Sequence, residues 1–244
     1  MRTTNTAALA VITLGMVMSL SLDRGAAQAP PSPDQMVAAL RQNLAESQKR
    51  LRQYEWIETT AISLKGEEKS RKQQRVYYGA DGKLTKLPIG EQPQAAQGGG
   101  GGRRGGRLKE RIVENKKDEM QDYMERAVNL IHLYVPPSPA TIQKAKDAGN
   151  MLLRPPQQGR VRVEFPEFIQ PADLMAIEVD AKALLLSALS VATYLEKPED
   201  AVTLNVRFGA LNDGTGYPAQ TTLDAKAKNI RVVVENSGHR PLAR

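Results

Sequence analysis

The chain has 244 residues, carries 34 Lys and Arg against 27 Asp and Glu for a net charge of +7, and contains no Cys. The absence of Cys excludes a disulfide framework, a Cys-ligated metal site and a thiol nucleophile. The two histidines, His132 and His239, are too few for a multi-histidine metal centre. With 41% hydrophobic and 25% charged residues, the composition is typical of a folded protein, not of a wholly disordered one.

Residues 1–27 have the pattern of a cleavable secretory signal. Arg2 precedes an uncharged apolar run of 16 residues, 7–22, which is shorter than the roughly 20 residues that a membrane span needs. Small residues follow, and we expect cleavage after Ala27. A retained membrane anchor is the alternative interpretation. We therefore expect a periplasmic or secreted protein whose mature chain, residues 28–244, has no transmembrane segment.

The positive charge is a weak indication of nucleic-acid binding. Removal of residues 1–27 lowers the net charge to +6, and three of the remaining positive charges are arginines of one glycine-rich segment (Arg103, Arg104 and Arg107). The rest of the chain is close to neutral, and an exported protein rarely meets nucleic acid. We expect no nucleic-acid partner.

The first part of the mature chain predicts a helix followed by three strands. Residues 33–51 place their apolar side chains at helical spacing, which favours an amphipathic helix of about five turns. Alternation then indicates a strand from Tyr54 to Leu64 and a second strand that ends near Tyr78. Asp81-Gly82 is a hairpin signal before a third strand. These strands are expected to be antiparallel neighbours.

Residues 88–107 interrupt this pattern. Seven of the 19 glycines lie between Gly98 and Gly106, interleaved with arginine. No Gly-Lys-Ser/Thr sequence opens a helix here, so the segment is not a phosphate-binding loop. It is interpreted as a flexible, solvated insertion.

Helices and then a strand meander are predicted for the second half. Residues 108–113 fit either a short strand or the start of a helix, and helices are expected over 117–134 and from Ser138 to about 153, before Pro155-Pro156. Six alternating segments follow, at 161–165, 175–179, 184–195, 202–208, 217–223 and 230–234. The 184–195 segment is apolar on both faces, so it is expected to be covered on both sides. The fold class is α+β, with an antiparallel sheet of about nine strands and helices on one face.

The residues give little support for catalysis. Asp118, Glu119 and Asp122 are expected at the start of a helix, where negative charge favours the helix dipole. His132 is interpreted as a partly buried helix residue and His239 as part of a polar tail, and no G-x-S-x-G elbow occurs. We expect no enzyme activity, no catalytic residue, no cofactor and no metal. An enzyme that uses two carboxylates in a cleft is kept as an alternative.

The order of these elements resembles the LolA-like periplasmic lipoprotein-carrier group. The resemblance rests on Tyr54-Glu55-Trp56, Val76-Tyr77-Tyr78 and Asp81-Gly82, followed by helices and the strand meander, and it covers residues 54–87 and 160–242. It implies a curved, incompletely closed antiparallel half-barrel over residues 28–244, with helices on its concave face. The glycine-rich insertion, the helical segment 117–153 and the small number of aromatic residues depart from that group.

The resemblance also implies a function. Acyl chains would enter between the sheet and the helices, so we expect non-covalent binding of an apolar or lipidated ligand, and lipid or lipoprotein transport. The side chains expected to form the cavity wall are Tyr54, Trp56, Ile62, Leu64, Val206 and Phe208. Trp56 fits core packing as well as a cavity wall. The alternative function is an envelope protein-interaction or sensor module with a closed core, a transient protein partner and no ligand.

Overall fold

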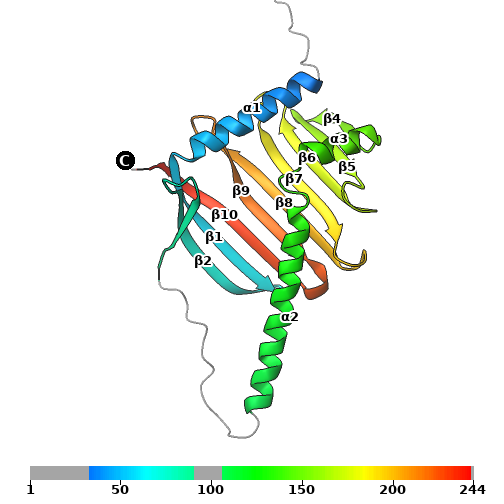
Figure 1. Ribbon diagram of the computed structural model, residues 1–244. Helices are drawn as coiled ribbons and strands as arrows, with labels where there is room; N and C mark the ends of the chain where they lie inside the picture. Colours follow the sequence, from blue (N-terminus) through cyan, green and yellow to red (C-terminus); the bar gives the residue numbers. More distant parts are fainter. Residues whose placement is uncertain (1–32, 91–105, 243–244) are drawn as a thin grey trace, which may run out of the picture.

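The computed structural model describes residues 33–90 and 106–242 (Figure 1). The predicted signal peptide, 1–27, lies outside the described residues. The same is true of residues 91–105, which form most of the predicted insertion. The described part of the chain consists of one antiparallel sheet and three α-helices.

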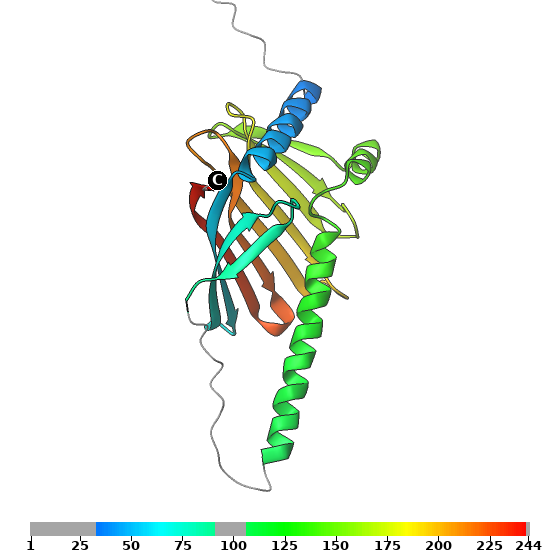
Figure 2. The ribbon, with the colours of Figure 1, turned by 60° about the vertical axis from the view of Figure 1, so that its left-hand side comes forward.

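The sheet has ten strands in the order β3-β2-β1-β10-β9-β8-β7-β6-β5-β4. Neighbours are antiparallel throughout, and β3 and β4 form the two edges, so the sheet is curved but not closed (Figure 2). The strands are β1 (Tyr54–Leu64), β2 (Glu67–Tyr78), β3 (Leu84–Pro88), β4 (Leu152–Gln157), β5 (Arg160–Pro166), β6 (Leu174–Asp180), β7 (Leu186–Tyr194), β8 (Ala201–Ala210), β9 (Gly216–Ala225) and β10 (Ile230–Pro241).

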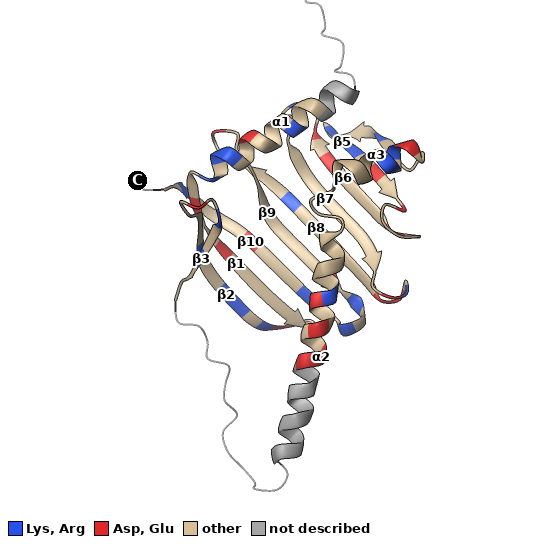
Figure 3. Ribbon diagram, in the orientation of Figure 1, with Lys and Arg blue, Asp and Glu red and all other residues tan. Residues whose placement is uncertain are grey.

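The long-range pairing of β1 with β10 joins the N-terminal and C-terminal parts of the described chain. Ile62 lies opposite Val232, and Thr60 lies opposite Val234. Since successive side chains of a strand point to opposite faces, this register continues one apolar face across the whole sheet. Charged residues are sparse along the central strands and gather on the helices, the turns and the outer strands (Figure 3).

All three helices lie over the concave face of the sheet (Figures 1 and 2). They are α1 (Pro33–Leu51), α2 (Gly106–His132) and α3 (Pro139–Asp147). Ala127 and Ile131 of α2 and Ala145 of α3 pack in one buried cluster with side chains of β5 to β9. Leu51 of α1 packs instead against Trp56 and Val76, at the other end of the sheet. The helices therefore cover two separate regions of the concave face.

The fold predicted from the alternation is confirmed, and one strand is added to it. Residues 152–157 form the edge strand β4, although a helix is predicted up to about 153. Gly149, with a φ of +77°, ends α3, and the Gly149 N–H donates to the Lys146 carbonyl. Pro155 and Pro156 lack N–H groups and are accommodated because β4 has a partner on one side only.

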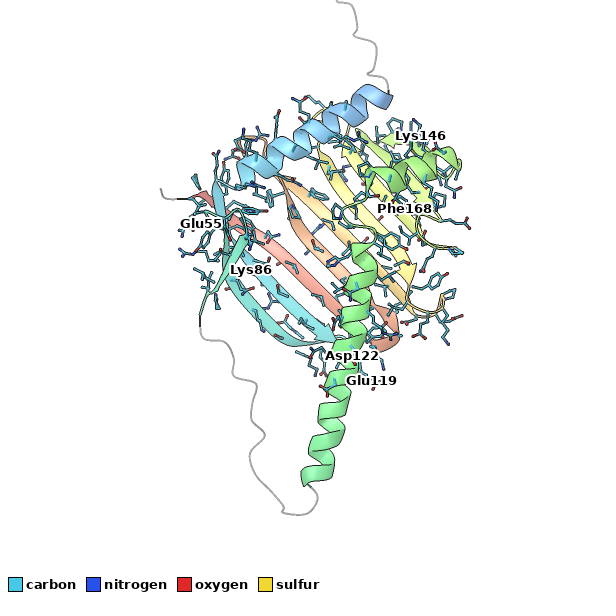
Figure 4. The ribbon with its side chains drawn as sticks, in the orientation of Figure 1. Glu55, Lys86, Glu119, Asp122, Lys146 and Phe168 are labelled. Atoms are coloured by element: carbon cyan, nitrogen blue, oxygen red, sulfur yellow. The ribbon has the colours of Figure 1, made fainter. Side chains whose placement is uncertain are left out.

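The start of α2 agrees with one of the two alternatives predicted for residues 108–113. The helix begins at Gly106, so these residues are helical, and the predicted boundary at 117 is wrong. Leu108 to Lys117 are mostly good helix formers, and nothing among them stops a helix. Asp118, Glu119 and Asp122 consequently lie inside α2, far from its first turn (Figure 4). Glu119 accepts a hydrogen bond from Lys228 Nζ at 2.7 Å.

The prediction that residues 184–195 are covered on both faces is half wrong for β7. The strand is central and its concave side is buried, with Leu189 and Val191 in the core. Its other side carries the small residues Ala188 and Ser190, which are partly buried, and Ala192, which is exposed. The three helices are on the concave side, so no helix of residues 33–90 and 106–242 covers this side.

Tyr134 fixes the end of the α2 region to the sheet. Its buried hydroxyl lies 2.5 Å from Asp173 Oδ2 and 2.8 Å from Thr193 Oγ1. Asp173 is buried and also accepts the N–H groups of Phe168, Ile169 and Gln170. Burial and the Asp173 hydrogen bond raise the pKa of Tyr134, so its phenol stays protonated. The network satisfies a buried carboxylate, which would otherwise be costly.

Substitution of Tyr134→Phe is expected to lower the free energy of unfolding by about 2 kcal/mol, because Asp173 and Thr193 lose a buried partner. Urea unfolding followed by tryptophan emission measures the loss. Tyr194→Phe is the control, since its exposed hydroxyl donates to the Pro171 carbonyl at 3.0 Å; that loss should stay below about 1 kcal/mol. Equal losses of unfolding free energy in Tyr134→Phe and Tyr194→Phe would show that burial of the network contributes nothing to stability.

Candidate ligand pocket

A pocket of about 320 Å³ lies between α1 and the concave face of the sheet. Most of its lining is apolar or aromatic, with a few polar groups from α1, β1 and β10. The lining residues are Leu44, Ser47, Gln48, Leu51, Trp56, Glu58, Tyr78, Leu84, Leu185, Leu186, Phe208, Gly216, Tyr217, Pro218, Asn236 and His239. A mostly apolar concavity with a few placed polar groups is the usual form of a small-molecule site.

The roof of the pocket, α1, is held by a small number of contacts. The Gly216 N–H donates to Ser47 Oγ at 3.0 Å, and Asn43 Nδ2 donates to the Leu184 carbonyl at 2.9 Å. A Cβ on Gly216 would lie 3.4 Å from Ser47 Oγ, so this glycine allows the close approach of α1 to β9. Leu51 anchors the end of the helix against Trp56.

The floor of the pocket is centred on Trp56, the sole tryptophan of the chain. Its Nε1–H donates to Asn236 Oδ1 at 3.0 Å, and Asn236 Nδ2 donates to the Pro218 carbonyl at 2.8 Å. The Tyr78 ring lies 6.1 Å from the Trp56 ring, centroid to centroid. The indole is therefore fixed in orientation by neighbours on three other strands.

His239 belongs to this aromatic group, although the sequence predicts a polar tail there. Its ring lies 5.7 Å from Trp56 at an interplanar angle of 18°, and 4.1 Å from Tyr217. Burial lowers the pKa of His239, which favours the neutral imidazole. Neither ring nitrogen has a hydrogen-bond partner among residues 33–90 and 106–242, so both are available to a ligand or to water.

A bulge explains why alternation does not predict this position. Glu55 pairs with Arg240 and Ile57 with Ser237, so Trp56 faces two residues of β10, Gly238 and His239. The extra residue reverses the alternation, and His239 shares a face with Asn236 three positions earlier. Gly238 supplies the φ of +63° that the bulge requires.

Glu58 is a second pocket residue that the sequence analysis does not single out. It follows Trp56 on the same face of β1 and is only 9% exposed. Lys86 Nζ of β3 lies 2.6 Å and 2.8 Å from the two Glu58 carboxylate oxygens. Because burial of an unpaired carboxylate is costly, Lys86 is what permits this residue in an apolar wall.

The predicted cavity-wall residues divide between three environments. Trp56 and Phe208 line the pocket. Tyr54 packs beside Trp56, outside the lining, and its hydroxyl donates to Asp213 Oδ2 at 2.9 Å, which raises the pKa of Tyr54. Leu64 packs near Tyr123 beneath α2, Val206 lies in the main core, and Ile62 is 37% exposed on β1.

No second carboxylate joins Glu58 in the lining of the pocket. Glu164 and Glu178 lie together on the opposite face of the sheet, and both pair with Arg162, at 2.8 Å and 2.7 Å. Arg162 and Arg154 lower the pKa of Glu164, so its carboxylate stays ionised and is a poor proton donor. His132 is exposed at the end of α2, so the partial burial predicted for it is wrong. Over residues 33–90 and 106–242, no group of three His, Asp or Glu side chains could hold a metal ion.

No protein-family model and no curated protein matches this sequence. Among solved structures, the chain is similar to a DUF1329 family protein from Desulfovibrio piger, with 13% identity, a TM-score of 0.38 and coverage of 84% of this chain and 92% of that chain. It is also similar to a LolA superfamily protein from Nitrosomonas europaea, with 8% identity, a TM-score of 0.36 and coverage of 84% and 94%. The second of these proteins belongs to the group that the sequence resembles.

The described helices include none that is both long and apolar enough to cross a bilayer. Residues 1–27, the predicted signal, lie outside the described helices.

The environment of His239 predicts a pH dependence of stability. Its pKa is lowered in the folded state, so the unfolded chain takes up the proton first as the pH falls below about 6.5. The contribution of the neutral His239 to the free energy of unfolding is present above that pH and is lost at lower pH. Between pH 7.5 and 5.5, His239→Asn should therefore lose less stability than the wild type.

The measurement is urea unfolding at both pH values. His132→Asn is the matched control, because it removes the other histidine, which is exposed. A loss in His239→Asn as large as that in the wild type and in His132→Asn would contradict the prediction.

Proposed function

We propose that the protein is exported and binds an apolar or lipidated ligand non-covalently, in the pocket between α1 and the sheet. The observation that carries this proposal is the 320 Å³ pocket itself, with Trp56 and Phe208 in its wall. Such a volume lies at the lower end of the range of small-molecule sites. It suits a single acyl chain or another slender apolar group better than a complete two-chain lipid.

The groups in the pocket support binding over covalent chemistry. The Ser47 hydroxyl accepts the Gly216 N–H and has no hydrogen bond to His239, so it lacks the activating base of a nucleophilic serine. Glu58 is engaged by Lys86. The wall therefore offers surface and a few hydrogen bonds, which is what a carrier or a ligand sensor needs.

Export and location belong to the same proposal. The signal pattern in residues 1–27 directs the chain out of the cytoplasm, and a protein there can pass apolar ligands through an aqueous compartment. The pocket keeps the apolar part of such a ligand away from water. Lipid or lipoprotein transport is the role that combines these two features.

A protein-interaction module is the second candidate, and the edge strand β3 favours it. Leu84 and Leu87 of β3, and Ile89 just after it, are 43%, 39% and 42% exposed. An open strand edge with apolar side chains can pair with an extended segment of another protein. If the protein captures a partner equally well with and without a ligand in the pocket, the two functions are independent of each other.

Leu44→Phe is expected to weaken binding of N-phenylnaphthylamine, a neutral apolar fluorophore, by about tenfold. The larger ring from α1 takes space inside the pocket, and overpacking of this kind costs roughly 1–3 kcal/mol. Excitation of Trp56 and detection of energy transfer to the probe measures the affinity, and Trp56 is the sole donor.

Leu40→Phe is the matched control, since Leu40 lies one turn earlier on α1 and is not a lining residue. Its affinity for the probe should equal that of the wild type. The pocket is not the binding site if the two variants bind alike, and the proposed function fails if the wild-type protein binds no apolar probe.

Native mass spectrometry of the protein recovered from its exported location tests the proposal without a chosen probe. We expect a chain that begins at Gln28 and carries a co-purified apolar or lipidated molecule that organic extraction releases. A full-length chain would favour the retained anchor. A cleaved chain without any ligand, and without mass gain on addition of acyl ligands, would favour the interaction module.

A further inference from the structure

The charges around the pocket are unevenly distributed, and this bears on the kind of ligand that the proposed function involves. Glu58 is the sole charged side chain in the pocket lining, and no Lys or Arg of the described chain contributes to it. An anionic headgroup inside this pocket would thus meet a carboxylate and would find no cation in the wall.

The positive partner of Glu58 is more exposed than Glu58 and does not line the pocket. Lys86 comes from β3, beyond the end of α1, and is not a lining residue (Figure 4). Its ammonium donates to both carboxylate oxygens, and its side chain is 41% exposed, against 11% for that of Glu58. The buried end of the ion pair that faces the pocket is therefore negative, and the end that faces solvent is positive.

The remaining polar groups of the wall are neutral. The His239 imidazole is uncharged in this environment and has two unpartnered nitrogens. The Ser47 hydroxyl accepts one hydrogen bond and has its own proton to donate, and the Asn236 amide keeps one N–H free after its bond to the Pro218 carbonyl. These groups can pair with hydroxyl, ester or amide groups of a ligand.

We infer that the natural ligand is a single-chain amphiphile with an uncharged polar group, and that Glu58 excludes anionic amphiphiles such as free fatty acids. The inference rests on the proposed function, because it assumes that the apolar chain occupies this pocket. A carboxylate of the ligand would lose its water and face like charge, whereas a hydroxyl or ester would satisfy the neutral groups. Rejection by an unfavourable contact is a common source of specificity.

Displacement of N-phenylnaphthylamine by three twelve-carbon amphiphiles tests the inference, at pH 8 and below their micelle concentrations. The competitors are monododecanoylglycerol, dodecanoate and dodecyltrimethylammonium. In the wild type we expect the uncharged glyceride to bind at least about tenfold more tightly than dodecanoate. If dodecanoate or dodecyltrimethylammonium binds most tightly of the three, the inference is overturned.

Glu58→Gln should reduce the preference for monododecanoylglycerol over dodecanoate to about threefold or less. The variant removes the negative charge from the pocket wall and leaves the Lys86 ammonium without its partner. The double variant Glu58→Gln with Lys86→Gln, which removes both charges, serves if the single variant does not fold, and it should show the same loss of preference. Glu68→Gln is the matched control, since Glu68 pairs with Arg71 on the exposed part of β2; it should keep the wild-type preference.

The outcomes separate this inference from the proposed function. Binding of all three amphiphiles with equal affinity, or a preference that persists without Glu58, would overturn the inference and leave the pocket as a binding site. Failure of all three amphiphiles and of the fluorophore to bind would overturn both.

Discussion

The structure depends on one constraint: a ten-stranded sheet has a single apolar face, and three helices must cover it. The larger part is covered by α2 and α3, whose side chains share one core with the central strands. The Tyr134–Asp173 network fixes that arrangement with buried hydrogen bonds. The smaller part is covered by α1, which spans the sheet but approaches it closely at few points, such as Ser47 on Gly216. The pocket is what remains between that helix and the floor.

Most of the fold could be predicted, because strand alternation is a local property. In nine of the ten strands, the alternation is clear enough to be seen in the sequence. In β4 the signal is hidden, since Leu152 and Leu153 are both exposed and Pro155-Pro156 resembles a helix stop. The start of α2 is hidden for a different reason: the glycine-rich segment before it has no capping pattern, so nothing in the sequence places the boundary at Gly106.

The pocket could be predicted only in part. Trp56 and Phe208 follow from alternation, since the extra residue of the bulge beside each of them lies on the neighbouring strand. His239 does not, because a single extra residue in β10 reverses the face on which it lies. Glu58 appears in the sequence as a charge that interrupts an apolar face. Its partner Lys86 is two strands away in the sheet, so only the folded structure shows why the charge is tolerated.

These two unpredicted residues give the pocket its chemistry. A wall of leucines and aromatic rings alone would accept any apolar chain, and selectivity has to come from the few polar groups. Burial lowers the pKa of His239, which favours the neutral imidazole, and Glu58 is paired with Lys86. Both conditions disfavour a ligand anion, the first by withholding a positive charge and the second by supplying a negative one. The Glu58 carboxylate is costly to keep in an apolar wall even with Lys86 beside it, and a hydrophobic residue would pack there at least as well. Stability of the fold therefore does not account for the charge, whereas the ligand selection that we propose would.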